Sequence, residues 1–207
     1  MVSQVSEAML DVIADALVDK GYILLSDIIP DPISLALLEK TQAGQDIHFK
    51  QAAIGRGVEQ QINTEIRLDK ISWLNNQDVI DRDYLAMMDQ LKEGLNRRLF
   101  MGLFDFESHY AVYEPGGFYK KHLDALQGSQ NRILSTVFFL NPDWQNNDGG
   151  ELIIYDEADL PLEVINPQMG TLVLFLSERF PHEVRPTKKT RNSIAGWFSV
   201  SHTHHGF

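Results

Sequence analysis

The stretch Ile133-Leu-Ser-Thr-Val-Phe-Phe-Leu140 is the part of the sequence that decides the fold. An extended strand points successive side chains to opposite faces of its sheet, and both sets are mainly apolar here. A strand of this kind is buried on both sides. We therefore expect a second sheet against one face and helices against the other.

Further short segments of strand character follow Ser108, and turns rich in glycine, asparagine and proline separate them. Besides 132–140, the expected strands are Ser108–Tyr113, Tyr119–Asp124, Glu151–Tyr155, Thr171–Leu176, His182–Arg185 and Asn192–Val200. Seven or eight short strands at this spacing are typical of a jelly roll, in which two sheets enclose a mouth. The pattern predicts an α+β protein with a mainly β core over residues 108–200.

The first 100 residues predict helices and a few early strands that support this core. The first expected helix has the apolar stripe Leu10, Ile13, Ala14 and Leu17 and ends at Gly21, and a strand Gly21–Leu25 follows. A second helix is expected from the Asp31 N-cap, with Pro32 at its first position, to about Ala43. A third is expected from Asp81 to about Leu99. Because no linker or repeat interrupts the chain, we expect one domain over 1–207.

Composition limits the classes of partner and location. A net charge of −11 argues against nucleic acid, which binds basic faces. The chain has no cysteine, shows no signal-peptide pattern and has no apolar run near the roughly 18 residues that span a bilayer. We therefore expect a soluble cytoplasmic protein without a membrane partner.

The triplet His122-Leu123-Asp124 is the main candidate for chemistry. Residues two apart on a strand point to the same face, so His122 and Asp124 could reach one metal ion, with His182 from a later strand as a third ligand. Two histidines and one carboxylate bind Fe(II) on one face and leave three positions open, which suits an oxygenase. A surface histidine beside a solvated aspartate is the alternative.

Other histidines could replace His182. His109 lies on an earlier expected strand and is the strongest rival. Three more histidines, His202, His204 and His205, lie near the C-terminus. We expect a disordered tail there, and its histidines could bind metal adventitiously.

Arg191 is the candidate anchor for a carboxylate ligand. It stands at the start of an apolar strand that would enter the core, where a lone charge is costly to bury. A bound dicarboxylate would provide the partner for its two-pronged guanidinium. A surface cation beside Lys188 and Lys189 is the alternative.

With these residues, the chain resembles the 2-oxoglutarate- and Fe(II)-dependent dioxygenases that have a double-stranded β-helix fold, a cupin-like jelly roll. Within them it is most similar to the prolyl 4-hydroxylases of hypoxia-inducible factor and to their bacterial homologues. The stretches that carry the resemblance are 66–73, Tyr113–Gly116 leading to His122, 139–144, Gly149–Leu152, Pro181–Val184 and Arg191–Trp197.

The resemblance implies site residues and cofactors. His122, Asp124 and His182 would bind Fe(II), and Arg191 would bind the distal carboxylate of 2-oxoglutarate. Tyr113 would line the co-substrate pocket and Trp197 would pack beside the iron, although both could be ordinary core aromatics. O₂ would be the second co-substrate, ascorbate a reductant, and succinate and CO₂ the co-products.

The resemblance also implies a substrate. It indicates 4-hydroxylation of a prolyl residue in a protein, a link to oxygen sensing, and elongation factor Tu as a partner of bacterial members. Arg132 would lie near the active-site mouth, and Ala52 to Glu65 would fold over the peptide, although a solvated loop or loose hairpin is the alternative. The animal enzymes have a tyrosine on the distal carboxylate where this chain has Phe139, which leaves Arg191 with less help.

Two other functions stay open at this point. One is an oxygenase of the same fold that acts on a free amino acid or another small molecule. The other is a catalytically silent metal-binding or sensing module, since a fold does not fix a function.

Overall fold

The computed structural model describes residues 4–42, 48–53, 62–125 and 131–200. Its elements are α1 (Glu7–Asp19), β1 (Tyr22–Ser26), α2 (Asp31–Gln42), β2 (Lys50–Gln51), β3 (Lys70–Trp73), α3 (Val79–Leu99), β4 (Asp105–Tyr113), β5 (Tyr119–His122), β6 (Arg132–Phe139), β7 (Leu152–Tyr155), β8 (Pro161–Ile165), β9 (Thr171–Leu176), β10 (His182–Val184) and β11 (Arg191–Ser199). No helix in these ranges is long and apolar enough to cross a membrane.

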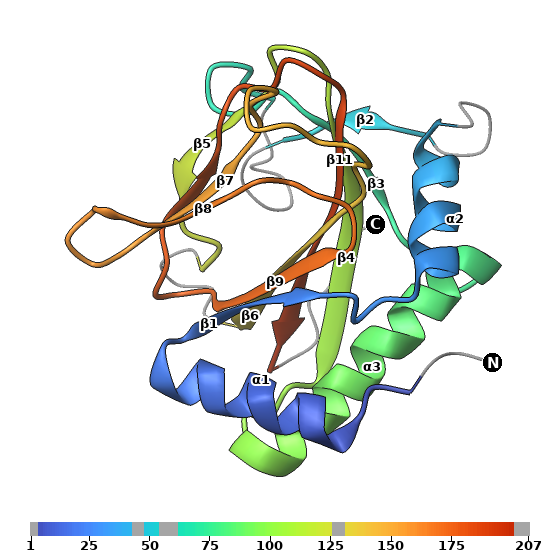
Figure 1. The fold of residues 1–207 in the computed structure, drawn as a ribbon, viewed down its shortest axis with the longest axis vertical. Coiled ribbons are helices and arrows are strands. Elements are labelled where there is room, and N and C mark those ends of the chain that lie inside the picture. Colours follow the sequence, from blue (N-terminus) through green and yellow to red (C-terminus); the bar gives the residue numbers. More distant parts are fainter. Residues whose placement is uncertain (1–3, 43–47, 54–61, 126–130, 201–207) are drawn as a thin grey trace.

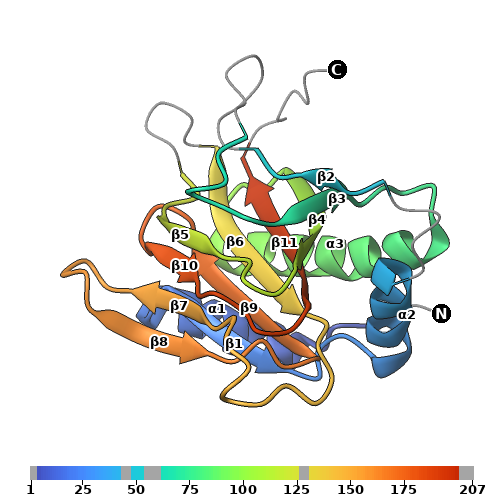
Figure 2. The same cartoon turned by 90° about the horizontal axis from the view of Figure 1, so that it is seen from above.

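The strands form two antiparallel sheets, as a jelly roll requires. The larger has seven strands in the order β1-β9-β6-β11-β4-β3-β2, and the smaller has four in the order β5-β10-β7-β8. Figures 1 and 2 show α1 and α3 along one side of the larger sheet and the smaller sheet on the other side. This arrangement confirms the predicted mainly β core with supporting N-terminal helices.

Strand β6 is buried from both sides, as its sequence predicted. Leu134 and Phe138 point to the helices and belong to the core that α1 and α3 complete. Phe139 points the other way, into the core between the two sheets. The period of two along one central strand therefore separates a helix-facing core from a sheet-facing core.

The helices follow their sequence signals with small shifts. In α1, Ser6 caps the first turn by accepting from the Met9 amide, all four stripe residues are buried, and Gly21 follows with φ +84°, which favours glycine. The start predicted for α2 was wrong by one residue, because the Ser34 amide already donates to the Pro30 carbonyl.

The third helix also begins earlier than predicted. Asp78 caps α3 by accepting from the amides of Ile80 and Asp81. Asp81 is instead buried within the first turn, where it accepts from the Tyr110 hydroxyl at 2.6 Å and so ties α3 to β4. Its polar side chain therefore serves tertiary packing and does not mark the helix boundary.

The strand predictions hold for the core, with one correction that matters for the site. The segment expected as strand over Tyr119–Asp124 stops at His122, and Asp124 lies in a bend. The sequence analysis also missed β8, an edge strand that begins at Pro161 and is largely exposed.

Candidate metal centre

Strand pairing brings the two candidate histidines together. Strands β5 and β10 are antiparallel neighbours, and His182 is the register partner of His122. The Nδ1 atom of His122 lies 2.8 Å from the Lys120 carbonyl, and that of His182 lies 3.1 Å from the Phe180 carbonyl. A carbonyl can only accept, so each Nδ1 carries the proton and each Nε2 keeps its lone pair for a metal.

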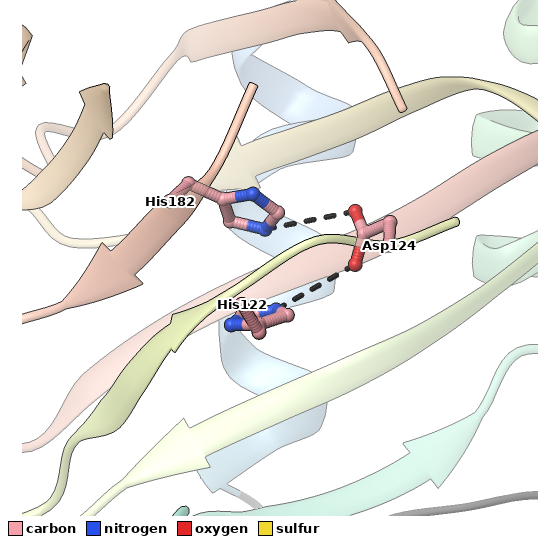
Figure 3. A group of neighbouring side chains, drawn as sticks. All are labelled: His122, Asp124 and His182. Atoms are coloured by element: carbon pink, nitrogen blue, oxygen red, sulfur yellow. Dashed lines mark ion pairs between the residues drawn. The ribbon is translucent and has the colours of Figure 1, made fainter. Parts of the chain in front are cut away.

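Asp124 completes the group from the bend after β5. Its Oδ1 lies 3.6 Å from Nε2 of His122, and its Oδ2 lies 3.6 Å from Nε2 of His182 (Figure 3). The potential ligand atoms of the three residues all lie within 4.8 Å of one another. Two imidazole nitrogens and one carboxylate oxygen therefore face a common point, which is the donor set of the two-histidine, one-carboxylate site of Fe(II) oxygenases.

The protonation states also suit a divalent cation. Burial lowers the pKa of His182 to about 4, although nearby Asp124 raises it, so this imidazole is neutral at pH 7. Burial alone would raise the pKa of Asp124, but His182, His122 and Ser135 together hold it well below its usual range. A charged carboxylate and a neutral imidazole are the forms that bind metals.

One aromatic ring and one guanidinium group support His122. The Tyr119 ring stacks on the His122 ring with centroids 3.7 Å apart and an interplanar angle of 17°. The guanidinium of Arg67 lies over Tyr119, 4.3 Å from its centroid, and two hydrogen bonds of 2.8 and 2.6 Å hold it to Asp69. The sequence analysis missed this support, whose only sequence signal is the Arg-x-Asp spacing.

Arg191 is buried and lines the same pocket, and one nitrogen of its guanidinium makes no hydrogen bond to the described residues. It is 1% exposed, its Nε donates to the Gly150 carbonyl at 2.7 Å, and its Nη1 donates to Oγ of Ser193 at 3.0 Å. Its Nη2 has no hydrogen-bond partner among the described residues. Burial lowers the pKa of Arg191 to about 10, so it is charged at neutral pH, and a carboxylate ligand would satisfy both the charge and the free donor.

Known proteins resemble this chain in sequence and in fold. The family model of the 2OG-Fe(II) oxygenase superfamily matches residues 108–199, which contain the triad and Arg191. The crystal structure of a Pseudomonas putida prolyl-4-hydroxylase is 34% identical, covers 94% of this chain and 100% of its own, and superposes with a TM-score of 0.84. This chain belongs to the 2OG-Fe(II) oxygenase superfamily.

Other members of the superfamily extend the comparison. Human Egl nine homolog 1 is 31% identical over 144 residues, which are 65% of this chain and 33% of that protein, so this chain spans about a third of its relative's length. A Trichoplax adhaerens prolyl hydroxylase, solved with a hypoxia-inducible factor peptide, is 24% identical with a TM-score of 0.82. It covers 94% of this chain and 90% of its own, and at that identity it supports the fold alone.

The wall of the oxygenase pocket contains both aromatics named from the sequence. Tyr113 and Trp197 are buried and line the pocket together with the triad and Arg191. Tyr113 pairs with Arg191 across β4 and β11, and its ring lies 5.0 Å from the guanidinium carbon. The Phe139 ring, from β6 on the other side of β11, has its centroid 5.1 Å from that carbon and offers no hydroxyl.

Arg132 lies against Trp197 and does not line the pocket. Its guanidinium carbon is 3.7 Å from the Trp197 ring centroid, and its Nε and Nη2 bind the Glu107 carboxylate at 2.9 and 2.6 Å. Trp197 lines the pocket, and Arg132 packs against its ring. Any effect of Arg132 on a bound substrate would therefore act at the Trp197 ring.

The rival histidine lies outside the triad. His109 is buried between Trp73 and Trp197, with ring centroids 5.2 and 5.4 Å away, and its Nδ1 donates to the Tyr110 carbonyl. Burial lowers its pKa to about 4. His109 contacts Trp197 but does not line the pocket, and His182 takes the position in the metal-ligating group.

Two predicted segments lie largely outside the described residues. The C-terminal set His202, His204 and His205 falls within 201–207, and residues 54–61 make up most of the expected substrate loop Ala52 to Glu65. Ala52 itself is fully buried, and its amide donates to the Asp69 carbonyl at 2.9 Å. This anchor joins the start of the segment to the Arg67–Asp69 pair beside the metal ligands.

Proposed function

We propose that this chain is an Fe(II)- and 2-oxoglutarate-dependent dioxygenase that hydroxylates a prolyl residue, at the 4-position, in a protein substrate. One observation carries the proposal: the same pocket is lined by a two-histidine, one-carboxylate group and by a buried arginine whose Nη2 has no hydrogen-bond partner among the described residues. The first fits Fe(II), and the second fits the far carboxylate of a dicarboxylate co-substrate.

In this proposal, each group in the pocket has one role. His122, Asp124 and His182 hold Fe(II), and Arg191 holds the distal carboxylate of 2-oxoglutarate with Tyr113 beside it. Trp197 forms the wall next to the metal and excludes water there. When bound, Fe(II) and 2-oxoglutarate supply the activation of O₂, with succinate and CO₂ as co-products.

The relatives support a prolyl substrate. The Pseudomonas putida protein, which is 34% identical to this chain, is a prolyl-4-hydroxylase. That the proline belongs to a protein follows from the resemblance to the hydroxylases of hypoxia-inducible factor. The resemblance to bacterial members adds elongation factor Tu as the first substrate to test. Oxygen sensing, ascorbate as reductant and a cytoplasmic location stay predictions.

Mass spectrometry of candidate substrate proteins tests the proposal. The protein would be incubated with Fe(II), 2-oxoglutarate, O₂ and candidate proteins, beginning with elongation factor Tu, and the products would be digested and sequenced by mass spectrometry. We expect a gain of one oxygen atom on a proline, dependent on 2-oxoglutarate and absent with His122→Ala. Turnover of free proline alone would favour a small-molecule oxygenase. No succinate from 2-oxoglutarate with any substrate would favour a silent module.

A further inference from the structure

Asp124 is held differently from the two histidines beside it. Strand pairing fixes the backbones of His122 and His182, and carbonyl bonds orient both rings. Asp124 lies beyond the end of β5, in a bend. Strand pairing therefore does not aim its carboxylate, and another contact must do so if the ligand is to keep one geometry.

A serine on a central strand makes that contact. The Oγ of Ser135 donates to Oδ2 of Asp124 at 2.7 Å, and both side chains are buried. Ser135 lies on β6, which is paired on one side to β9 and on the other to β11. Its backbone is thus fixed from both sides, and its hydroxyl provides a firm point for the bend.

A second serine orients the first. The Oγ of Ser177, which is fully buried, lies 2.9 Å from the Oγ of Ser135. The Ser177 amide also donates to the Ile133 carbonyl, which fixes the segment after β9 against β6. A hydroxyl has one proton and two lone pairs, so Ser135 can donate to Asp124 while accepting from Ser177.

We propose that Ser135 is a positioning residue for the metal centre, and that Ser177 orients its hydroxyl. Ser135 holds Oδ2 of Asp124, which lies 3.6 Å from Nε2 of His182, and thereby fixes the orientation in which Oδ1 faces Nε2 of His122. This inference rests on the proposed metal centre and adds to it the cause of the fixed orientation of the carboxylate. A carboxylate free to turn could bind through both oxygens, and the second oxygen would occupy a position that the co-substrates need.

Cobalt(II) titration of the metal-free protein tests this assignment without turnover. The visible ligand-field spectrum of Co(II) reports both affinity and coordination number. Outer partners of metal ligands typically contribute ten- to a hundredfold to affinity, so we expect Ser135→Ala to weaken Co(II) binding by about that factor and to change the spectrum. Ser135→Thr keeps the hydroxyl and should restore most of both.

The chain offers a matched control on the neighbouring part of the sheet. Ser108 on β4 is also a buried serine, but its Oγ has no partner among the described residues. Ser108→Ala should leave Co(II) affinity and spectrum unchanged. Ser177→Ala should weaken binding several-fold, less than Ser135→Ala, because the Ser135 hydroxyl remains.

The outcomes separate this inference from the proposed function. If the wild type binds no Co(II), or binds it equally in His122→Ala, the metal centre itself is wrong. If the wild type binds and Ser135→Ala shows the same affinity and spectrum, only the positioning role is overturned. Thermal unfolding of each metal-free variant checks the fold. Should Ser135→Ala not fold, unchanged binding in Ser177→Ala overturns the proposal and weakened binding supports it.

Discussion

The two faces of strands β6 and β11 have different roles. Toward the helices, these strands present Leu134, Phe138, Ile194 and Phe198, all fully buried in the apolar core. Toward the smaller sheet, β11 presents Arg191, Ser193 and Trp197 to the pocket. Alternation along the same backbone thus combines a stabilising face with a chemical face. We therefore expect substitutions on the first face to affect folding and those on the second to affect binding and turnover.

The largest expected effect comes from breaking the chemical face at its metal ligands. His122→Ala or Asp124→Ala should reduce turnover to background while the midpoint of unfolding of the metal-free protein barely changes. A structural metal would instead be needed for folding itself. Succinate release and circular dichroism of the same samples check this. Wild-type turnover in His122→Ala would contradict the assignment.

Next in size is the stabilising face. Phe138 is fully buried and its ring stacks on Tyr84 with centroids 5.8 Å apart. Phe138→Ala should lower the free energy of unfolding by about 3–5 kcal/mol. Turnover per folded molecule should stay near wild type, as measured below the new unfolding midpoint. A folded variant with wild-type stability and no turnover would reverse the comparison.

The co-substrate anchor should give a smaller and more selective effect. Arg191→Lys keeps a positive charge but loses the two-pronged geometry. A hydrogen bond to a charged group contributes roughly 1.5–3 kcal/mol, so 2-oxoglutarate should bind about ten- to a hundredfold more weakly, with metal affinity unchanged. Calorimetric titration of 2-oxoglutarate into the Mn(II)-loaded protein measures the first affinity, and titration of Mn(II) into the metal-free protein measures the second.

A second substitution sharpens the same test. The Phe139 ring centroid lies 5.1 Å from the guanidinium carbon of Arg191, and this ring has no hydroxyl to donate. Phe139→Tyr in the Arg191→Lys background should recover part of the lost affinity. Unchanged affinity in Arg191→Lys itself would show that Arg191 is not the anchor of the co-substrate.

The smallest effect concerns His109, a buried base behind the pocket wall. Its pKa is about 4 in the folded chain and roughly 6.5 when unfolded, so the unfolded chain takes up the proton first as pH falls. Its contribution to stability is complete above the unfolded pKa and declines toward pH 4. At pH 5 this linkage amounts to about 2 kcal/mol relative to neutral pH.

His182 contributes a loss of the same sign, so the wild type alone does not isolate His109. His109→Phe keeps an aromatic ring between Trp73 and Trp197 and removes the proton. Urea unfolding of both metal-free proteins at pH 7 and pH 5 should show the smaller loss in the variant. Equal losses would mean that His109 is not buried in its neutral form.

The elements and site residues that could be predicted from the sequence are those that depend on hydrophobic periodicity and on the residue types that bind metals. The α1 stripe and the two-sided β6 follow from local spacing, and the candidacy of Arg191 follows from the cost of a buried charge. His182, 58 positions after Asp124, was one of several candidate histidines, and strand pairing selects it. Strand β8 was missed because a proline start and exposed side chains do not resemble a core strand.

The contacts that refine the site could not be predicted in this way. Asp124 was expected on the strand, yet β5 ends before it, and Ser135 holds its carboxylate from 11 positions along the chain. Tyr119 and Arg67 likewise meet through an isolated bridge between distant segments. Such contacts depend on how strands are paired in space, which residue spacing does not reveal.

We infer that one pocket holds Fe(II) on the triad and 2-oxoglutarate on Arg191. Anaerobic titration of 2-oxoglutarate into the Fe(II)-loaded protein tests both sites at once, because chelation of Fe(II) by this ligand gives a visible charge-transfer band. We predict a band that saturates at one equivalent, is absent in His122→Ala, and in Arg191→Lys appears only at higher 2-oxoglutarate. No band in the wild type, or an equal band in His122→Ala, would contradict the account.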